Sequence, residues 1–597
     1  MKDQDMPPDT KYASRLNLIF WISFFGVVAV ILGKALIVAP ELHGNLSILD
    51  NDSVMRLIAV QNWLGGQGWF DTVEYRLVPP EGVLMHWSRY IDALIGGLIV
   101  ALSWFMPALI AQTAALVIWP TFLAISLIAA IGIGTRRLFG AEAGCFAMLC
   151  ALVWPFTSDF YFLPGLIDHH NVQVLMIVVI TFAIVWPGQP MRSGVVAGVA
   201  AAFALAIGLE TLPYILLAGA LLFARARMGM TEHADRLLAV FCVAFGIAAV
   251  LFWLGQTPAD RRGIGVCDQL GLPVLSLIAI AAVASIVPMV LIKDRGLLRF
   301  GASLVLIAIG CALAWPLLGP CIAGPYGSLP IEVQEIISTG IIEAQPALVY
   351  APANVLNFLK MAVPVVGALV FAAVFWVRLD RSSVAAQQKR DVVGQLMLLA
   401  LVGILASFSQ IRLLLMTAAA VPALVGFVLA LLLQKYLQSR SAESAMSLFA
   451  VGILLVSPVL LEAPVKALMP TPPPSTSMLD ASCREDPALQ PLNAIAPGIF
   501  LTPMNLGPVL ILTTHHSSLS GPYHRSPSAF ANGYLPFRMK EAELRDYVAN
   551  TNATHLMLCG ATTYHVGFAR DLVDGAQADW LEPVEVEAGD LMVFEVK

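Results

Sequence analysis

The sequence has 597 residues, of which 58% are hydrophobic and only 12% are charged. Soluble globular proteins carry about 25% charged residues, so this composition excludes a soluble enzyme, a disordered protein, a fibrous protein and a nucleic-acid-binding protein. The 34 Lys and Arg residues and 40 Asp and Glu residues give a net charge of −6, which provides no basic field to attract nucleic acid or anionic lipid. The composition predicts a polytopic membrane protein with additional mass outside the bilayer.

Long apolar segments recur along the first three quarters of the chain. The first sixteen residues are polar, and the apolar stretch that follows is longer than the core of a cleavable signal peptide, so we expect a retained first transmembrane helix. A helix that crosses a bilayer needs about 20 mostly apolar residues, and the chain offers about 13 such segments. We expect spans near 17–38, 107–135, 143–162, 171–187, 193–209, 211–228, 235–255, 273–293, 299–318, 357–377, 392–409, 413–434 and 446–463. The apolar stretch 92–106 fits either an extension of the second span or an interfacial helix.

Basic residues indicate how these spans are oriented. Clusters of Lys and Arg fall in the loops on the side that also holds the N-terminus, and the positive-inside rule assigns that side to the cytoplasm. The clusters are Arg136 with Arg137, Arg225 with Arg227, Lys293 with Arg295 and Arg299, Arg378 to Arg390, and Lys435 with Arg440. We therefore expect a multi-pass protein with the N-terminus in the cytoplasm and residues 1–463 as its transmembrane domain. The compact chain and the lack of a eukaryotic-type signal indicate a bacterial inner membrane. The outer side then receives the loops 39–91, 163–170, 256–272 and 319–356 and the C-terminus.

Residues 464–597 are expected to form a separate periplasmic domain. It begins with the Pro/Ser-rich segment PTPPPSTS, which is typical of a linker. The run VLILTT (509–514) predicts a buried strand, EAELRDYVAN (541–550) a helix and THLMLCG (554–560) a second strand. The final segment from Trp580 predicts a closing hairpin. Together these elements indicate a small α/β domain.

Four of the eight cysteines lie in the outer loops or the C-terminal domain: Cys267, Cys321, Cys483 and Cys559. Disulfides persist outside the cytoplasm, so the pairs Cys267–Cys321 and Cys483–Cys559 are one interpretation. Free buried thiols are the other, because spacing alone does not determine pairing.

Ionisable residues gather at the outer ends of the spans, in four segments that are far apart in the sequence. The segments contain Asp50 and Asp52; Asp168, His169 and His170; Glu343; and Arg412. Carboxylates that converge beside a low-dielectric region repel each other, and a hard divalent cation such as Mg²⁺ or Mn²⁺ relieves that repulsion. An imidazole such as His170 favours Mn²⁺, and the guanidinium of Arg412 matches a phosphate group. These residues predict a metal site that acts on a lipid phosphate.

Each motif also has a structural explanation. An acidic pair such as Asp50 and Asp52 often caps a helix N-terminus, and the segment Asp168 to Asn171 could cap the helix that follows it. Glu343 could be an ordinary loop carboxylate, and Arg412 could extend its charge to the membrane interface. Their common location on one membrane face favours the functional interpretation.

In this order, the motifs resemble those of the oligosaccharyltransferase catalytic subunits, within the GT-C glycosyltransferase superfamily. Asp50-Asn51-Asp52 before Arg56 is similar to the acidic motif of the family's first outer loop, and Leu166 to Asn171 takes the place of its second acidic motif. Thr339 to Pro346 fits the Ser/Thr-x-x-Glu motif of the fifth outer loop with one residue added before Glu343. Arg412 stands where the family has an arginine that contacts pyrophosphate.

The resemblance implies a fold, a cofactor and a set of site residues. The fold is a GT-C membrane domain of about 13 helices with the N-terminus inside, followed by a C-terminal domain on the outer side. The cofactor is Mn²⁺ or Mg²⁺, and Arg412 is implied to bind the donor phosphate. The implied metal ligands are Asp50, Asp52, Asp168, His170 and Glu343, with Asp50, Asp52 and Glu343 also taking part in catalysis.

Two features depart from the family. His170 stands where the family has an acidic residue, and the Trp-Trp-Asp motif that reads a peptide acceptor is absent. Its place is taken by THHSSLSGPYHR (514–525), for which a structural strand and turn, or a zinc site of three histidines, are alternatives. The candidates for binding the acceptor or another part of the substrate are Arg56, His169, His515, His516, Tyr523, His524 and Arg525.

The predicted function is the transfer of a sugar or oligosaccharide from a polyprenyl-phosphate or polyprenyl-pyrophosphate donor to a lipid, glycan or protein acceptor on the periplasmic face. Membrane lipids are expected as partners, and nucleic acid is not. A metal-independent polysaccharide polymerase or ligase and a transporter of lipid-linked sugars are the alternatives. Transporters place ionisable groups near the bilayer midplane, whereas here Glu210, close to a span boundary, is the main exception to the outer location.

Overall fold

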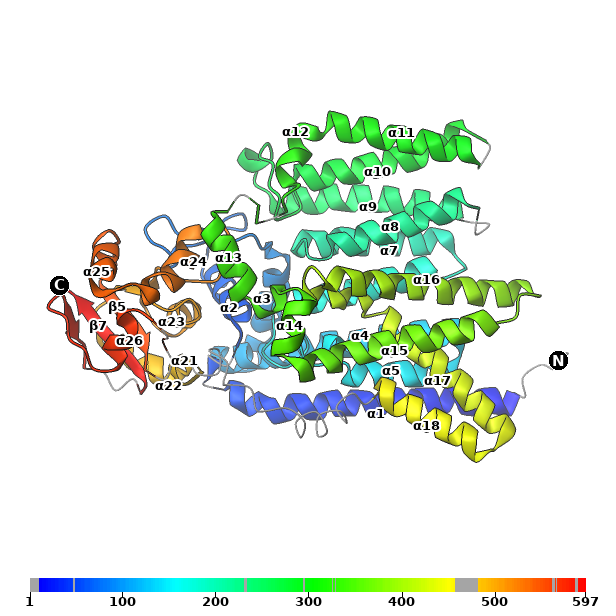
Figure 1. Ribbon diagram of the computed structural model, residues 1–597, viewed down its shortest axis with the longest axis horizontal. Helices are drawn as coiled ribbons and strands as arrows, with labels where there is room; N and C mark the ends of the chain where they lie inside the picture. Colours follow the sequence, from blue (N-terminus) through cyan, green and yellow to red (C-terminus); the bar gives the residue numbers. More distant parts are fainter. Residues whose placement is uncertain are drawn as a thin grey trace.

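The computed structural model describes residues 10–43, 45–46, 49–229, 234–293, 296–324, 326–327, 329–456, 481–560, 564, 566–585 and 589–597. A bundle of long helices carries a smaller α/β domain at one end, and the N-terminus lies near the other end (Figure 1). The end that carries the α/β domain is called the C-domain end below. The predicted linker PTPPPSTS lies outside the described residues.

Each predicted span overlaps a helix of the bundle over part or all of its length, and 457–463 lie outside the described residues. The helices are α1 (Thr10–Leu42), α4 (Ala108–Phe139), α5 (Ala141–Val153), α6 (His170–Val185), α7 (Pro190–Ile207), α8 (Leu212–Arg227), α9 (Ala234–Gln256), α10 (Leu272–Leu291), α11 (Leu297–Leu313), α12 (Trp315–Leu318), α15 (Val355–Arg378), α16 (Val384–Ser407), α17 (Ala420–Ser439) and α18 (Ala442–Val456). In the described residues, eight helices are long and apolar enough to cross a membrane, and the bent pair Leu297–Leu313 and Trp315–Cys321 makes a ninth if it counts as one span.

Some predicted spans are interrupted in ways that shape the C-domain end. The expected span 143–162 is not continuous, because α5 ends before Pro155 and a 3₁₀ turn, η2 (Pro155–Thr157), follows it. The span expected to begin at 413 opens instead with a 3₁₀ segment, η6 (Ile411–Thr417), before α17 starts. At these breaks the backbone beside the C-terminal domain is not α-helical. Several of the polar side chains of the candidate site lie on it.

The first loop is an ordered element rather than a simple connection. It contains α2 (Asn51–Leu64) and a short hairpin of β1 (Val73–Glu74) and β2 (Val83–Leu84). The ambiguous stretch 92–106 is a separate helix, α3 (Arg89–Ser103), and Pro107 lies between it and α4. The structure thus excludes the alternative that this stretch extends the second span.

The C-terminal domain contains a five-stranded sheet in the order β4-β3-β5-β7-β6. The strands are β3 (Ile499–Leu501), β4 (Ser517–Ser518), β5 (His555–Cys559), β6 (Leu581–Pro583) and β7 (Leu591–Val596). β3 pairs in parallel with β4 and β5, whereas β5, β7 and β6 are antiparallel. The predicted strand at 555–559, the closing hairpin and the helix α25 (Glu541–Ala549) are confirmed.

The expected strand VLILTT is wrong, because this segment forms the helix α23 (Gly507–Thr513). Pro508 occupies its first turn, where the missing N–H is tolerated. Val509, Leu510 and Ile511 are all buried, and the helix packs against α2 of the first loop (Figure 1). A short apolar run fits a strand or a helix equally well, and here the contact with α2 determines the outcome.

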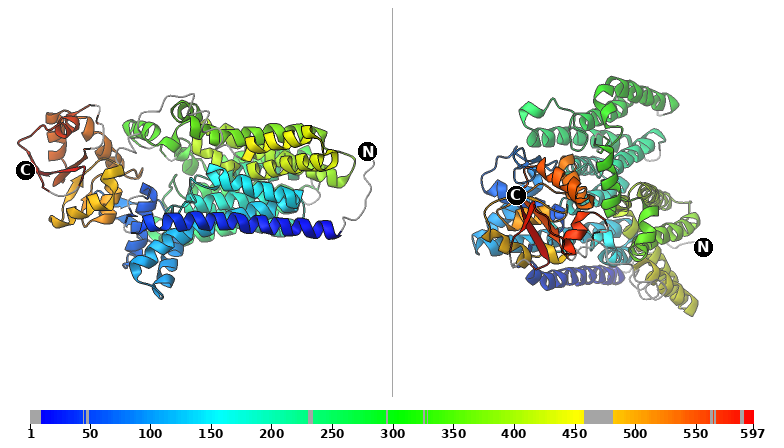
Figure 2. Two further views of the ribbon diagram at one scale, coloured as in Figure 1. Left: turned by 90° about the horizontal axis from the view of Figure 1, so that it is seen from below. Right: turned by 60° about the vertical axis from the view of Figure 1, so that its left-hand side comes forward.

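The first loop joins the C-terminal domain to the bundle (Figure 2). Leu77 forms an isolated parallel bridge with Ser518, and the Ser518 amide donates to the Arg76 carbonyl at 2.9 Å. The Arg76 guanidinium also donates to the Thr514 carbonyl at 2.8 Å. This backbone pairing attaches β4, at the edge of the sheet, to the first loop. The C-terminal domain is therefore held against the helix bundle.

Both cysteine pairs expected on the outer side are disulfides in the structure. Cys267 and Cys321 have Cα atoms 5.2 Å apart, and Cys483 and Cys559 have Cα atoms 5.8 Å apart. The second bond ties the short helix α21 (Ala481–Arg484) to β5 in the middle of the sheet. It therefore links the start of the C-terminal domain to its core.

Removal of this second disulfide is expected to destabilise the C-terminal domain. The bond closes a segment of 76 residues, and loss of a native disulfide from a small domain outside the cytoplasm typically costs about 2–5 kcal/mol. The Cys483→Ser/Cys559→Ser variant should therefore unfold at a lower temperature in differential scanning fluorimetry, and dithiothreitol, which also reduces Cys267–Cys321, should lower the unfolding temperature of the wild type as well. Cys145→Ser, at a free cysteine, is the control. Equal unfolding temperatures for all three proteins would contradict the prediction.

Candidate active site

A cavity of about 1220 Å³ lies at the C-domain end, between the helix bundle and the C-terminal domain. Its walls come from the first loop, the α5–α6 and α7–α8 links, the loops 256–272 and 319–356, the α16–α17 link and the C-terminal domain. The lining includes Asp50, Asp52, Asp168, His169, His170, Glu343, Arg412, Tyr523 and His524. The structure thus brings together every residue that the sequence suggested for metal binding, catalysis and phosphate binding.

Three consecutive residues at the start of α6 form the centre of this site. Asp168, His169 and His170 are buried, and they offer ligand atoms that all lie within 4.8 Å of one another. They make up the only such cluster of three or more metal-binding side chains in the described part of the chain. The His169 side chain does not cap α6, so the capping explanation of this segment does not account for its histidines.

His169 holds Asp168 in place. Its Nδ1 donates to Asp168 Oδ1 at 2.6 Å, and its Nε2 lies 3.5 Å from Glu210 Oε2. Burial alone would lower the pKa of His169, but the negative charges of Asp168 and Glu210 outweigh it and raise the pKa to about 10. As an imidazolium between two carboxylates, His169 orients Asp168 and has no free lone pair for a metal.

His170 has the opposite arrangement. Its Nδ1 lies 3.0 Å from Gln173 Oε1, and its Nε2 lies 3.5 Å from Asp168 Oδ2. A histidine that donates one ring N–H to a carbonyl oxygen presents the other nitrogen as a metal ligand. Asp168 Oδ2 is buried and has no hydrogen-bond partner among the described residues. A buried carboxylate oxygen without a donor, opposite an available imidazole nitrogen, fits a divalent cation between them.

Arg56 lies behind this cluster rather than in the cavity. Its side chain is 1% exposed and contacts Asp92 Oδ1 at 2.9 Å and Asp168 Oδ1 at 3.4 Å. Its guanidinium also lies 4.5 Å from the centre of the Trp87 ring. Arg56 was expected among the substrate-binding residues, but the structure makes it a buried counter-ion that positions Asp168.

Asp50 and Asp52 stand at the start of α2. The Asp50 carboxylate caps this helix by accepting the Ser53 amide at 2.6 Å, as the structural explanation of the acidic pair proposes. Burial and then the carboxylates of Asp168, Asp50 and Glu343 raise the pKa of Asp52 well above its ordinary value. Asp50 is also raised, mainly by burial. The negative charges at this wall of the cavity therefore repel one another.

Glu343 and Arg412 face each other on the other side of the cavity. Glu343 lies in η5 (Ile342–Ala344), and its Oε1 is 3.7 Å from Arg412 Nη1. Arg412 stands in η6, where the Ile411 amide donates to the Gln345 carbonyl at 2.8 Å and so fixes the loop 319–356 to this segment. The predicted metal ligand and the predicted phosphate-binding group are thus paired with each other, and Glu343 is 45% exposed.

The histidines of the C-terminal domain separate into two groups. His515 and His516 are not part of the cavity wall; their Nε2 atoms bond to the carbonyls of Ile495 and Leu492 at 3.1 and 2.8 Å. His524 and Tyr523 do line the cavity. A zinc site of His515, His516 and His524 is therefore not formed, and neither His515 nor His516 lies on the cavity wall where a substrate was expected to contact them.

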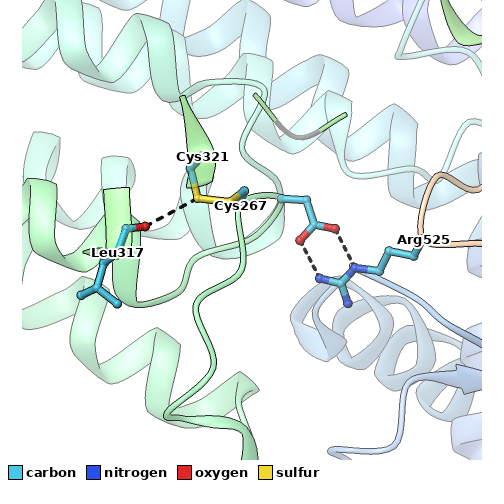
Figure 3. Close-up of a disulfide and its surroundings, with 5 residues drawn as sticks. Cys267, Leu317, Cys321 and Arg525 are labelled. Atoms are coloured by element: carbon cyan, nitrogen blue, oxygen red, sulfur yellow. Dashed lines mark hydrogen bonds and ion pairs between the residues drawn. A yellow bond between two sulfur atoms is a disulfide. The ribbon is translucent and has the colours of Figure 1, made fainter. Parts of the chain in front are cut away.

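Arg525 also lies outside the cavity wall. It forms a two-pronged ion pair with Asp268, through Nε at 2.6 Å and Nη2 at 2.8 Å (Figure 3). The pair connects the C-terminal domain to the loop 256–272, next to the Cys267–Cys321 disulfide. Arg525 thus holds the cavity wall together instead of contacting a substrate.

Several residues of the site were not predicted. Glu210 lines the cavity beside the Asp168 cluster, and the buried Gln173 stands behind it, with its Nε2 donating to Glu210 Oε2 at 2.8 Å. Their signal in the sequence is a lone carboxylate at a span boundary and an amide one turn into the helix that follows the histidines. His86 and Asp268 also line the cavity, but no motif identified them.

No protein-family model matches the sequence, and no curated protein matches it either. Solved structures of the oligosaccharyltransferase of Archaeoglobus fulgidus do match. The complex of this enzyme, AglB, with an inhibitory peptide and a dolichol-phosphate is 14% identical, covers 90% of this chain and 70% of its own, and has a TM-score of 0.62.

Two further structures of the Archaeoglobus fulgidus oligosaccharyltransferase agree. The apo form is 14% identical and covers 94% of this chain and 73% of its own, with a TM-score of 0.62. The complex with zinc and sulfate is 16% identical and covers 89% and 68%, with a TM-score of 0.58. The chain therefore has the GT-C glycosyltransferase fold of the oligosaccharyltransferases, a multi-pass helical membrane domain followed by a C-terminal domain with a β-sheet.

Proposed function

We propose that the protein is a metal-dependent glycosyltransferase that moves a sugar or oligosaccharide from a polyprenyl-phosphate or polyprenyl-pyrophosphate donor to an acceptor. The observation that carries this proposal is the cavity at the C-domain end, where Asp52, Asp168, His170, Glu343 and Arg412 face one space. The fold shared with an oligosaccharyltransferase that binds dolichol-phosphate supports the same reaction class.

Asp168 Oδ2 and His170 Nε2 are the atoms that fit a cation best, because one lacks a hydrogen bond and the other faces it at 3.5 Å. Asp52 and Glu343 are the further carboxylates within the same cavity. When bound, Mn²⁺ or Mg²⁺ would stabilise the negative charge that develops on the leaving phosphate. The mixed oxygen and nitrogen ligands favour Mn²⁺ over Mg²⁺, which prefers oxygen alone.

The remaining side chains have roles that follow from their charge and place. The guanidinium of Arg412 can bind two phosphate oxygens at once. In this structure it is paired with the carboxylate of Glu343. Asp52, whose pKa is raised, is suited to accept the proton of the attacking acceptor group once the repulsion from its neighbours is relieved. His169 and Arg56 keep Asp168 ionised and oriented throughout.

The apolar part of the cavity suits a polyprenyl tail. Its lining there includes Phe156, Phe160, Leu212, Val274, Leu277 and Met361, which come from helices or links of the bundle. A tail between these helices would place the phosphate at the polar wall, next to Arg412. We propose that the reaction takes place on the outer side of a bacterial inner membrane, with the N-terminus in the cytoplasm, because the basic loops lie at the end of the bundle opposite to the cavity.

The acceptor is not a peptide read by a Trp-Trp-Asp motif, since the sequence lacks one. A lipid, a glycan or another protein site is the class of acceptor that we propose. Trp87, Tyr523 and His524 form the cavity wall on the side of the C-terminal domain, where an acceptor would enter.

Metal removal tests this function. Transfer from radiolabelled polyprenyl-linked sugars, prepared as monophosphate and pyrophosphate, should cease in EDTA and return with Mn²⁺. Asp50→Ala, Asp168→Ala and Glu343→Ala should each lower the rate, whereas Asp574→Ala, at an exposed residue of the C-terminal domain, should not. Full activity of all three site variants would contradict the proposal. Transfer that persists in EDTA would instead favour the metal-independent polymerase or ligase.

A further inference from the structure

A second group of polar side chains lines the cavity next to the Asp168 cluster, and the proposed reaction assigns none of them to the metal, to the phosphate or to proton transfer. His86 comes from the first loop, His524 from the C-terminal domain and Tyr326 from the loop 319–356. The His86 and His524 rings have centroids 4.4 Å apart, and the Tyr326 ring lies 5.4 Å from His524. Three segments that are distant in the sequence therefore form one corner of the cavity.

This corner is held rigidly. His524 Nε2 donates to Asp268 Oδ2 at 3.0 Å, and Arg525 donates to the same carboxylate through Nε and Nη2. Cys267, the neighbour of Asp268, is bonded to Cys321, which fixes the loop 256–272 to the start of the loop 319–356 (Figure 3). A site whose side chains are fixed by ion pairs and a disulfide loses little freedom when it binds a ligand.

His86 is the member of this group whose ring nitrogens have no hydrogen-bond partner among the described residues, although His86 lines the cavity. Burial, together with the nearby His524 and Arg525, lowers the pKa of His86 well below its ordinary value. The ring is therefore neutral at physiological pH and offers one donor and one acceptor, which is what a hydroxyl group complements.

The charges of the corner also limit what it can bind. The carboxylate of Asp268 is already balanced by Arg525, and His86 adds no charge, so His86 itself has no strong attraction for a phosphate or a carboxylate. Aromatic faces of Trp87 and Tyr326 stand beside the imidazoles. Polar groups that match hydroxyls, next to apolar ring faces, suit a neutral polyol such as a hexose ring.

We propose that His86 and His524 form a carbohydrate-binding subsite, in which His86 contacts a hydroxyl of a neutral hexose. Trp87 connects the subsite to the reaction centre, since its ring lies 5.4 Å from that of His86 and 6.2 Å from that of His169. A sugar held there is separated from the Asp168 cluster by one aromatic side chain. This inference rests on the proposed function, and the hexose belongs either to the donor or to a glycan acceptor.

The experiment measures binding to the full-length protein in detergent micelles with Mn²⁺ present. One arm compares the Kd of undecaprenyl phosphate with the Kd of undecaprenyl phosphate that carries glucose, mannose or galactose. The other arm records saturation-transfer NMR of the three methyl hexosides on protein loaded with undecaprenyl phosphate. The variants are His86→Ala, His86→Asn and His524→Ala, and the control is His515→Ala, whose side chain is outside the cavity.

If the subsite binds the sugar of the donor, the wild type binds one hexosyl lipid more tightly than the bare lipid. His86→Ala then raises the Kd of that hexosyl lipid about 3- to 10-fold, which is the effect of losing one neutral hydrogen bond. The Kd of the bare lipid stays unchanged, which shows that the variant is folded, and His86→Asn restores part of the loss. If it serves a glycan acceptor, His86→Ala abolishes the methyl hexoside signal instead.

Two results would overturn the subsite: no hexose preference and no hexoside signal in the wild type, or the same values in His86→Ala as in His515→Ala. Failure of the wild type to bind undecaprenyl phosphate at all is a separate outcome, because it removes the proposed function and the subsite with it.

Discussion

Asp168→Asn is expected to reduce sugar transfer about 10²- to 10³-fold, the range seen when one group that stabilises developing charge is removed. Asp168 is the residue on which the site converges: it accepts from His169 at 2.6 Å, faces Arg56 at 3.4 Å and presents an unpaired oxygen toward His170. Asparagine keeps the shape of the side chain but removes the negative charge that a cation needs. Arg56 retains Asp92 as its partner, and His169 retains Glu210, so the fold should persist.

The measurement for Asp168→Asn has two parts. The transfer rate reports on catalysis, and Mn²⁺ binding followed by electron paramagnetic resonance reports on the metal site without any turnover. Asp159→Asn is the matched control, because Asp159 lies in the same α5–α6 link but pairs with Lys34 at the surface. Wild-type Mn²⁺ affinity in Asp168→Asn would contradict the assignment of this carboxylate to the metal, even if the rate fell.

The membrane domain was largely predictable because hydropathy reports directly on burial in lipid. Every expected span corresponds to a helix, and the errors occur where backbone chemistry interrupts an apolar run, as Pro155 does after α5. The orientation that we propose follows from the positive-inside rule. The helix α23 was misassigned because its apolar run is short and its partner, α2, lies more than 440 residues earlier in the chain.

The site was predictable in its charged residues but not in their pairing. Motif order identified Asp52, Asp168, Glu343 and Arg412, because the proposed reaction needs carboxylates and a cationic group that matches phosphate. Which residues face the cavity depends on contacts between distant segments, which spacing does not encode. The spacing of His515 and His516 therefore did not reveal that they bond to the carbonyls of Ile495 and Leu492 instead of lining the cavity.

Some cavity residues could not be predicted either, because contacts between distant segments cannot be inferred from spacing. His86 and Asp268 are single polar residues in long loops, without a neighbouring motif. They matter only because the disulfide at Cys267 and the ion pair with Arg525 bring their loops against the C-terminal domain. Long-range covalent and ionic links of this kind become visible only in the folded structure.

Arg412→Ala is expected to weaken the binding of undecaprenyl phosphate about 10- to 150-fold, the effect of losing hydrogen bonds to a charged group. The Arg412 side chain is only 14% exposed, and the opposing charge of Glu343 raises its pKa although burial acts in the other direction. The guanidinium is therefore a permanent cation at the cavity wall. Arg412→Lys should recover part of the affinity, because lysine keeps the charge but lacks the two-pronged geometry that matches phosphate oxygens.

Equilibrium binding of fluorescent undecaprenyl phosphate to the purified variants provides the measurement for Arg412. Arg390→Ala is the control: Arg390 lies near the opposite end of α16, where its guanidinium stacks on Trp376 at 3.9 Å, and its loss should leave the Kd unchanged. An Arg412→Ala protein that bound the lipid phosphate as tightly as Arg390→Ala would show that Arg412 serves only to hold Glu343. The phosphate would then need another cation, and the described cavity wall contains no other lysine or arginine.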